Sequence, residues 1–271
     1  MKYSLVFCSL FLSILVMAQP SKEEIIKHHI RKIAKTTTMG ESVYEQASWY
    51  DREGNDSAQS LYGKISVIKN TFNKGRLISV IHVNDDGKEG DKYLYVYGAD
   101  GSYTVTETDG AFGMKSYEWY NAKKKLTKSQ SPDGNTITYK YDAKGNLTHV
   151  NSDGQNNAVK IKRQHFYNAQ GQLIRTENDE EGFILKTVYT YDAKGRMTKA
   201  DYGDGTTSYT YNDKGKLINE LTMTGTKEEL IVRTTTNEYN DKGLLVKRVE
   251  KQKYYSEDES VTTITFEYEY F

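Results

Sequence analysis

Cysteine and proline are scarce in this chain of 271 residues, and each shortage excludes something. The single cysteine, Cys8, rules out an intramolecular disulfide. With only Pro20 and Pro132, the rest of the chain is free of the residue that interrupts β ladders. The chain also lacks an excess of either charge, since 37 basic residues balance 37 acidic ones. Nucleic-acid binding requires a clustered basic surface, so we expect no nucleic-acid partner.

Long apolar runs are absent except at the N-terminus. Lys2 precedes an apolar stretch over residues 5–16, and the small residue Ala18 follows it. This pattern is typical of a secretory signal peptide and is too short for a membrane span. We therefore predict a signal peptide at 1–19, a secreted, periplasmic or cell-surface location, and no membrane span after its removal. Cys8 lies inside the apolar stretch after the bulky Phe7, so no lipid anchor is predicted.

Catalytic and metal-binding patterns are missing as well. The chain has no Gly-x-Ser-x-Gly motif, no phosphate-binding glycine loop and, after residue 19, no cysteine nucleophile. The adjacent pair His28 and His29 would point about 100° apart on a helix, which is unsuited to joint metal binding. The other three histidines stand singly, and the acidic turns lack the spacing of a calcium loop. We expect no enzyme activity, no cofactor and no metal site.

What the chain does have is a recurring stretch, written most clearly from Tyr139 to Leu147 as YKYDAKGNL. Asp at the first position of a turn and Gly at the fourth predict a type I turn, here Asp142 to Gly145, in a hairpin with a glycine bulge. If Asp142 opposes Asn146, Tyr141 lies opposite Leu147, and Tyr139 lies opposite His149 on the same face.

Degraded copies of this stretch recur about every 24 residues, which marks a repeat architecture built from hairpin-sized units. Weaker copies begin at Tyr50, Phe72, Tyr97 and Tyr120, and a half-copy runs from Phe266 to Tyr270. The copy at Tyr120 has Lys124 where the others have glycine. The residues that we assign to the structural repeat motif are Tyr141, Asp142, Gly145, Leu147, Tyr167, Gly171, Leu173, Tyr191, Asp192, Gly195, Met197, Tyr211, Gly215, Leu217, Tyr239, Gly243 and Leu245.

The pattern Tyr-x-Tyr-Asp-x-x-Gly-x-Leu resembles the bacterial YD-repeat (RHS-like repeat) family. Five copies between Tyr139 and Leu245 match well, and the weaker ones extend the likeness over most of residues 49–271. The resemblance implies long β-sheets that curl into shells or tubes, and a mostly extracellular family. It also implies binding of carbohydrate or cell-surface material.

One helix is predicted, before the repeats. Ser21 and Glu24 form a capping box, and apolar residues at helical spacing continue to Ala34, with an end near Lys35. We expect this amphipathic helix to cap the exposed end of the sheet, with a membrane-surface or partner-binding helix as the alternative. The predicted organisation is a capping helix and linker at 20–40 and a single β domain at 41–271.

The repeat region alternates apolar and polar residues, as in Ile137-x-Tyr139-x-Tyr141. This favours an all-β fold, an antiparallel meander of hairpin repeats curled into an open or barrel-like sheet with a tyrosine-lined interior. A sandwich would also bury one face. An outer-membrane barrel shares the alternation, but a mean hydropathy of −0.76 makes it the weaker reading.

For function, we predict a secreted or envelope-associated non-catalytic scaffold that binds carbohydrate or cell-surface material. A structural or protein-interaction module of the cell envelope, with an envelope protein as partner, is the alternative. A small hydrolase with an unrecognised site is a third reading. The two tryptophans, Trp49 and Trp119, are the ligand-binding candidates, because a flat exposed ring can stack on a sugar.

Overall fold

The computed structural model describes residues 20–61, 64–154, 160–180, 182–225, 230–254 and 258–271. These residues form one helix, α1 (Lys22–Lys27), and 20 strands. The first ten strands are β1 (Ile30–Met39), β2 (Ser42–Tyr50), β3 (Asp56–Leu61), β4 (Lys64–Asn73), β5 (Arg76–Val83), β6 (Glu89–Tyr97), β7 (Tyr103–Thr108), β8 (Lys115–Tyr120), β9 (Leu126–Gln130) and β10 (Thr136–Tyr141). The second ten are β11 (Leu147–Ser152), β12 (Ile161–Tyr167), β13 (Leu173–Glu180), β14 (Phe183–Tyr191), β15 (Met197–Asp201), β16 (Gly205–Tyr211), β17 (Leu217–Thr224), β18 (Ile231–Tyr239), β19 (Leu245–Tyr254) and β20 (Ser260–Tyr270).

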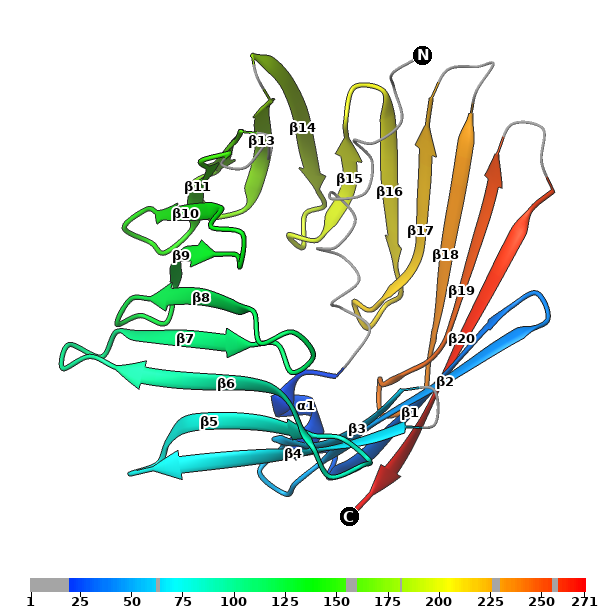
Figure 1. Cartoon of the computed structure of the whole chain (residues 1–271). Coiled ribbons are helices and arrows are strands. Elements are labelled where there is room, and N and C mark those ends of the chain that lie inside the picture. The colour runs from blue at the N-terminus through cyan, green and yellow to red at the C-terminus, as the bar shows by residue number, and fades with distance from the viewer. Residues whose placement is uncertain (1–19, 62–63, 155–159, 181, 226–229, 255–257) are drawn as a thin grey trace.

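The strands form a closed antiparallel barrel. Each strand pairs with the next in sequence, and β20 pairs with β1 to close the ring (Figure 1). The closing pair runs from Ile30 opposite Tyr270 to Met39 opposite Thr262. The predicted all-β meander is therefore confirmed, and the structure decides that it closes. Closure pairs the backbone groups that an open sheet would expose along its edge strands.

The hairpin turns that carry the repeat motif, here called motif turns, have the predicted geometry. The Asp142 N–H donates to the Asn146 carbonyl at 2.9 Å, and the Gly145 N–H donates to the Asp142 carbonyl at 3.0 Å. The Asp142 carboxylate accepts from the Asn146 N–H at 2.8 Å. Gly145 has φ +86°, a conformation that side chains with a Cβ disfavour. The hydrogen-bonded Asp and the left-handed Gly together close the hairpin.

Tyr141 lies opposite Leu147, as predicted, but the next pairing was predicted wrongly. Tyr139 pairs with Val150, and His149 pairs with Lys140, because one extra residue forms a bulge directly after Leu147. The Thr148 hydroxyl donates back to the Lys140 carbonyl at 3.1 Å across this bulge. The same shift follows the motif leucine or methionine at 173, 197, 217 and 245. Such bulges increase the local twist of a strand pair, and here they recur once in each of these repeats.

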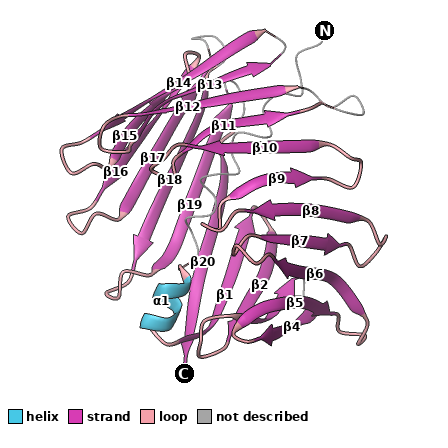
Figure 2. Cartoon of the chain, turned by 90° about the vertical axis from the view of Figure 1, so that its left-hand side faces the viewer, coloured by secondary structure: helices cyan, strands magenta, loops and turns pink. Residues whose placement is uncertain are grey.

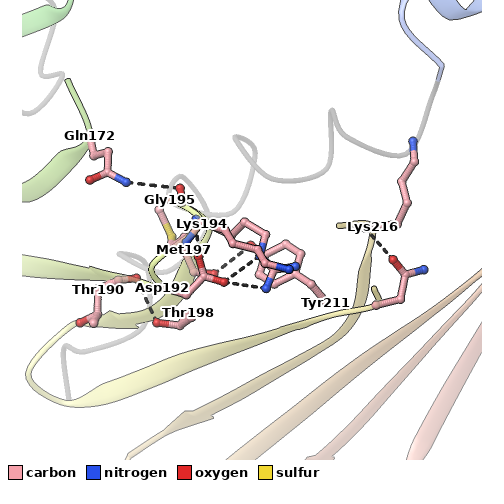
Figure 3. Close-up of polar contacts among 11 residues, drawn as sticks. Gln172, Thr190, Asp192, Lys194, Gly195, Met197, Thr198, Tyr211 and Lys216 are labelled. Atoms are coloured by element: carbon pink, nitrogen blue, oxygen red, sulfur yellow. Dashed lines mark hydrogen bonds and ion pairs between the residues drawn. The ribbon is translucent and has the colours of Figure 1, made fainter. Parts of the chain in front are cut away.

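The motif tyrosines join successive repeats. Seven of these phenols donate to the carbonyl of the apolar motif residue in the preceding repeat, at 2.7–2.9 Å. The Tyr120 phenol instead donates to Glu118. The donor and acceptor pairs are Tyr97 and Leu77, Tyr141 and Leu126, Tyr167 and Leu147, Tyr191 and Leu173, Tyr211 and Met197, Tyr239 and Leu217, and Tyr268 and Leu245. In the half-copy this bond is made by Tyr268. Figure 3 shows the bond from Tyr211 to Met197 beside the motif turn of Asp192.

The N-terminal helix is shorter than predicted. The capping box of Ser21 and Glu24 is present, but α1 ends at Lys27, and His29 takes a left-handed conformation with φ +53°. Ile30, Ile33 and Ala34 then belong to β1, so the predicted end near Lys35 and the predicted linker are both wrong. The tertiary structure prevails here, because β1 gains ladder hydrogen bonds from both β2 and β20.

Helix α1 does not cover a sheet end, since the closed ring has none. It lies inside the ring of strands (Figure 1), at the barrel end where β20 finishes (Figure 2). We call the strand face that contacts it the inner face. The main buried cluster gathers there around Ile25 and consists of Ile25, Ile30, Ile33, Tyr50, Leu244, Leu245, Ile264 and Phe266. Among the described residues, no helix is long and apolar enough to cross a membrane.

Candidate ligand-binding pocket inside the barrel

A ring of 20 strands is too wide for side chains to fill, and the inner face keeps an open pocket. Its volume is about 870 Å³, which is in the range of small-molecule sites. It lies beside α1 and the motif turns at 54, 75 and 101, and inner-face residues of β2 to β7 line it. The pocket therefore opens near the barrel end that carries the motif turns.

Tyrosine rings form one wall of the pocket. The rings of Tyr103 and Tyr120 are parallel, with centroids 4.5 Å apart, and Tyr97 and Tyr95 follow at 5.4 and 6.4 Å from Tyr103. The Tyr97 hydroxyl is occupied by the bond between repeats, and the Tyr120 hydroxyl donates to Glu118 at 2.6 Å. Burial raises the pKa of Tyr95 and Tyr103, so both stay protonated donors at neutral pH. These rings offer flat apolar faces together with hydroxyl groups.

Polar side chains also line the pocket. Asp56, Gln59, Asn70 and Arg76 all line the pocket. Burial raises the pKa of the Asp56 carboxyl, while the nearby charges of His82 and Lys22 oppose the rise. The Asn70 amide donates to the Asp56 carbonyl at 3.0 Å, and the Arg76 guanidinium lies 5.3 Å from the centroid of Tyr97. The pocket thus combines carboxylate, amide and guanidinium groups with aromatic faces.

A second polar cluster lies on the inner face of β17 to β19. Arg248 is buried and donates from Nε to the Asn237 amide oxygen at 3.0 Å. Glu220 and Glu250 face the same residue, Thr235, from its two neighbouring strands. Burial raises the pKa of Glu220, and the charge of Arg248 opposes that rise. This wall of the lumen is polar, in contrast to the tyrosine wall.

The two tryptophans proposed as ligand platforms lie elsewhere. Trp49 is opposite Lys32, and the lysine ammonium lies 5.5 Å from its ring centroid. Trp119 is opposite Lys128, whose ammonium lies 4.7 Å from its ring. Their strand neighbours point to the inner face, so both tryptophans point outward, on β2 and β8. The fold does not bring them together, and each has a lysine over its ring.

Sequence reasoning did not find the pocket. Its tyrosine wall comes from the alternating run Tyr93-x-Tyr95-x-Tyr97 and from Tyr103, which pairs with Tyr97 across the next hairpin. This alternating run can be recognised in the sequence, but the residues that line the rest of the pocket cannot. Within the described ranges, no group of three or more histidine, cysteine, aspartate or glutamate side chains is arranged to hold a metal ion. The signal peptide predicted at 1–19 lies outside the described residues.

Comparison with known proteins identifies the repeat. A family model described as RHS Repeat matches residues 120–155 and 167–207. Among curated proteins, no sequence matches. A porin-like protein from Bacteroides uniformis has 13% identity and a TM-score of 0.46, covering 89% of this chain and 98% of that one. The Photorhabdus luminescens Tc holotoxin pore has 13% identity and a TM-score of 0.31. The similarity covers 77% of this chain but only 15% of the holotoxin chain.

A TcdB2-TccC3 structure without its hypervariable C-terminal region gives 13% identity and a TM-score of 0.34 over 80% of this chain. This chain spans about 15% of its length. All three TM-scores are below 0.5, so these likenesses carry no functional argument. The family match falls on the copies of the motif at Tyr120, Tyr141, Tyr167 and Tyr191, and the copies outside it also form hairpins of the barrel. The resemblance inferred from the sequence is thus confirmed, and residues 120–155 and 167–207 of this β scaffold are RHS (YD) repeats.

Proposed function

We propose that the chain is a secreted or envelope-associated, non-catalytic scaffold that binds carbohydrate in the pocket inside the barrel. The observation that carries this proposal is that tyrosine rings line the same open pocket as Asp56, Asn70 and Arg76. Sugars present apolar ring faces and many hydroxyl groups, and they are complementary to aromatic faces beside carboxylate, amide and guanidinium groups.

The groups that would contact a sugar have bonding capacity to spare. In the described part of the chain, the hydroxyls of Tyr95 and Tyr103 and the Gln59 amide make no hydrogen bond to a protein group. The motif tyrosines differ, because their hydroxyls are committed to the preceding repeat. The proposal therefore rests on Tyr95 and Tyr103 and not on the motif tyrosines as a class.

The test is binding of the purified protein to a broad panel of glycans and cell-wall fragments, followed by calorimetry on the class that binds. Tyr95→Ala and Tyr103→Ala should each weaken binding about two- to tenfold, as expected for the loss of one aromatic contact. The matched controls are Trp49→Ala and Trp119→Ala on the outer face, which should leave affinity unchanged. Melting temperatures of all four variants separate loss of affinity from loss of fold.

Two outcomes would redirect the proposal. If only the tryptophan variants lose affinity while keeping their melting temperature, the ligand binds the outer face at the platforms predicted from the sequence. If a folded sample binds no glycan class, the alternative of a structural or protein-interaction module of the cell envelope is favoured. Pull-down of envelope proteins is then the next experiment.

A further inference from the structure

The two ends of the barrel carry opposite charge. In a meander the hairpins alternate between ends, so all motif turns lie at one mouth, and the other hairpin turns, here called return turns, lie at the opposite mouth. At the motif-turn mouth basic side chains exceed acidic ones. Exposed examples are Lys74, Lys123, Lys124, Lys194, Lys214 and Lys242. Acidic side chains predominate at the described return turns, including Glu41, Asp85, Asp86, Asp109, Asp204 and Asp258.

Acidic residues also occur at the motif-turn mouth, and several of their carboxylates accept hydrogen bonds within the motif turns. The Asp142 carboxylate accepts from Asn146, and the Asp192 carboxylate accepts from the N–H and guanidinium groups of Arg196 (Figure 3). Lys194 donates to Asp192 from its backbone N–H, and its ammonium makes no hydrogen bond among the described residues. The motif-turn mouth is therefore basic because its lysine and arginine side chains outnumber its carboxylates, several of which are held within their own turns.

Each mouth also exposes large apolar side chains. Phe72 and Phe271 are 52% and 50% exposed at the motif-turn mouth. Met39 and Phe112 are 53% and 79% exposed at the return-turn mouth. The Phe112 turn is well formed, since the Asp109 carboxylate accepts from the N–H groups of Ala111 and Phe112. These side chains add apolar area to each mouth beside the charged groups.

We propose that copies of this chain associate head to tail, with the basic motif-turn mouth of one barrel against the acidic return-turn mouth of the next. The partner is a second copy because the chain itself carries both complementary surfaces. Contacts between like mouths are disfavoured by repulsion, which selects this one orientation. Since the joined surfaces are different, the contact is heterologous and each new copy leaves a free mouth at either end. The inference goes beyond the proposed function and does not depend on a ligand in the pocket.

The first measurement is sedimentation of the purified protein over a range of concentrations at two salt levels. At about 20 mM salt we expect the average mass to rise with concentration. At about 500 mM the screening length falls to a few ångströms and the protein should be monomeric. Association that does not weaken with salt would overturn the proposal, and so would a monomer at both salt levels.

The decisive test uses two charge-reversed variants. Variant one carries Lys123→Glu, Lys194→Glu and Lys214→Glu, which makes its motif-turn mouth acidic. Variant two carries Glu41→Lys, Asp85→Lys, Asp86→Lys, Asp204→Lys, Asp258→Lys and Glu259→Lys, all at exposed positions, which makes its return-turn mouth basic. Each variant alone should associate at least about tenfold more weakly than the natural chain, because its two mouths now repel each other.

Mixing the two variants should restore association, because the acidic mouths of one then meet the basic mouths of the other. A loss of fold in either variant does not predict this rescue. A matched control is the triple variant Lys69→Glu, Lys140→Glu and Lys162→Glu, whose exposed lysines lie on strands and point outward. It has the same charge change as variant one and should associate like the natural chain. Variants that still associate alone, or a mixture that stays monomeric, would overturn the head-to-tail contact.

Discussion

The bond that links one repeat to the next can be removed by deleting a single oxygen. Tyr191→Phe removes the hydroxyl that donates to the Leu173 carbonyl at 2.8 Å, while the ring keeps its packing. The bond is half-buried, and burial raises the pKa of this phenol. One such hydrogen bond contributes about 0.5–1.5 kcal/mol to stability, and the carbonyl left without its donor places the loss in the upper part of that range.

The same change in three successive repeats should accumulate. Tyr167→Phe, Tyr191→Phe and Tyr211→Phe each break one bond of 2.8 Å to a different acceptor. Together they should lower the free energy of unfolding by about 3 kcal/mol, if the three bonds act independently. The measurement is urea denaturation followed by tyrosine and tryptophan fluorescence, with linear extrapolation to water.

The control is Tyr95→Phe, which removes a hydroxyl that makes no protein hydrogen bond within the described ranges. Its free energy of unfolding should stay within about 0.5 kcal/mol of the natural chain. If the triple variant also stays within that margin, the phenol ladder does not join the repeats, and the tyrosines act through their rings alone. A change of slope with urea would instead indicate a changed unfolded state.

Three further predictions concern single positions. Lys124 holds the glycine position of its motif turn at φ +58°, so Lys124→Gly should raise the free energy of unfolding by about 0.5–1 kcal/mol, whereas Lys123→Gly should lower it. Ile25→Ala removes a side chain that is 5% exposed against the β1 and β20 seam and should cost about 2–4 kcal/mol in a urea titration. For Glu220, the folded pKa is raised above the ordinary 4.5, so the folded state holds the proton more tightly. Its stabilising contribution is full at acidic pH and is lost as pH rises through the folded pKa. Glu220→Gln should therefore be more stable than the natural chain at neutral pH and should lose that advantage on acidification. An advantage that is independent of pH would contradict the raised pKa.

The sequence by itself determined the local structure of the repeat. Asp142 and Gly145 encode the turn through side-chain bonding and a left-handed backbone, and both effects act within five residues. The same reasoning found the pairing of Tyr141 with Leu147, the capping box of α1 and the all-β fold. The family likeness followed from the same motif and was confirmed over residues 120–155 and 167–207.

Tertiary structure decided everything that depends on contacts between distant residues. Ile30 and Ile33 suit a helix as well as a strand, and the pairing of β1 with β20, more than 200 residues away, makes them a strand. The bulge after Leu147 is likewise a property of two strands fitted into a curved sheet. The pocket likewise exists only because β2 to β7 curve around α1 and bring Asp56 and Tyr103 to one lumen. The separation of charge arises because alternate turns of a meander lie at opposite ends, and closure gathers each set of turns around one mouth.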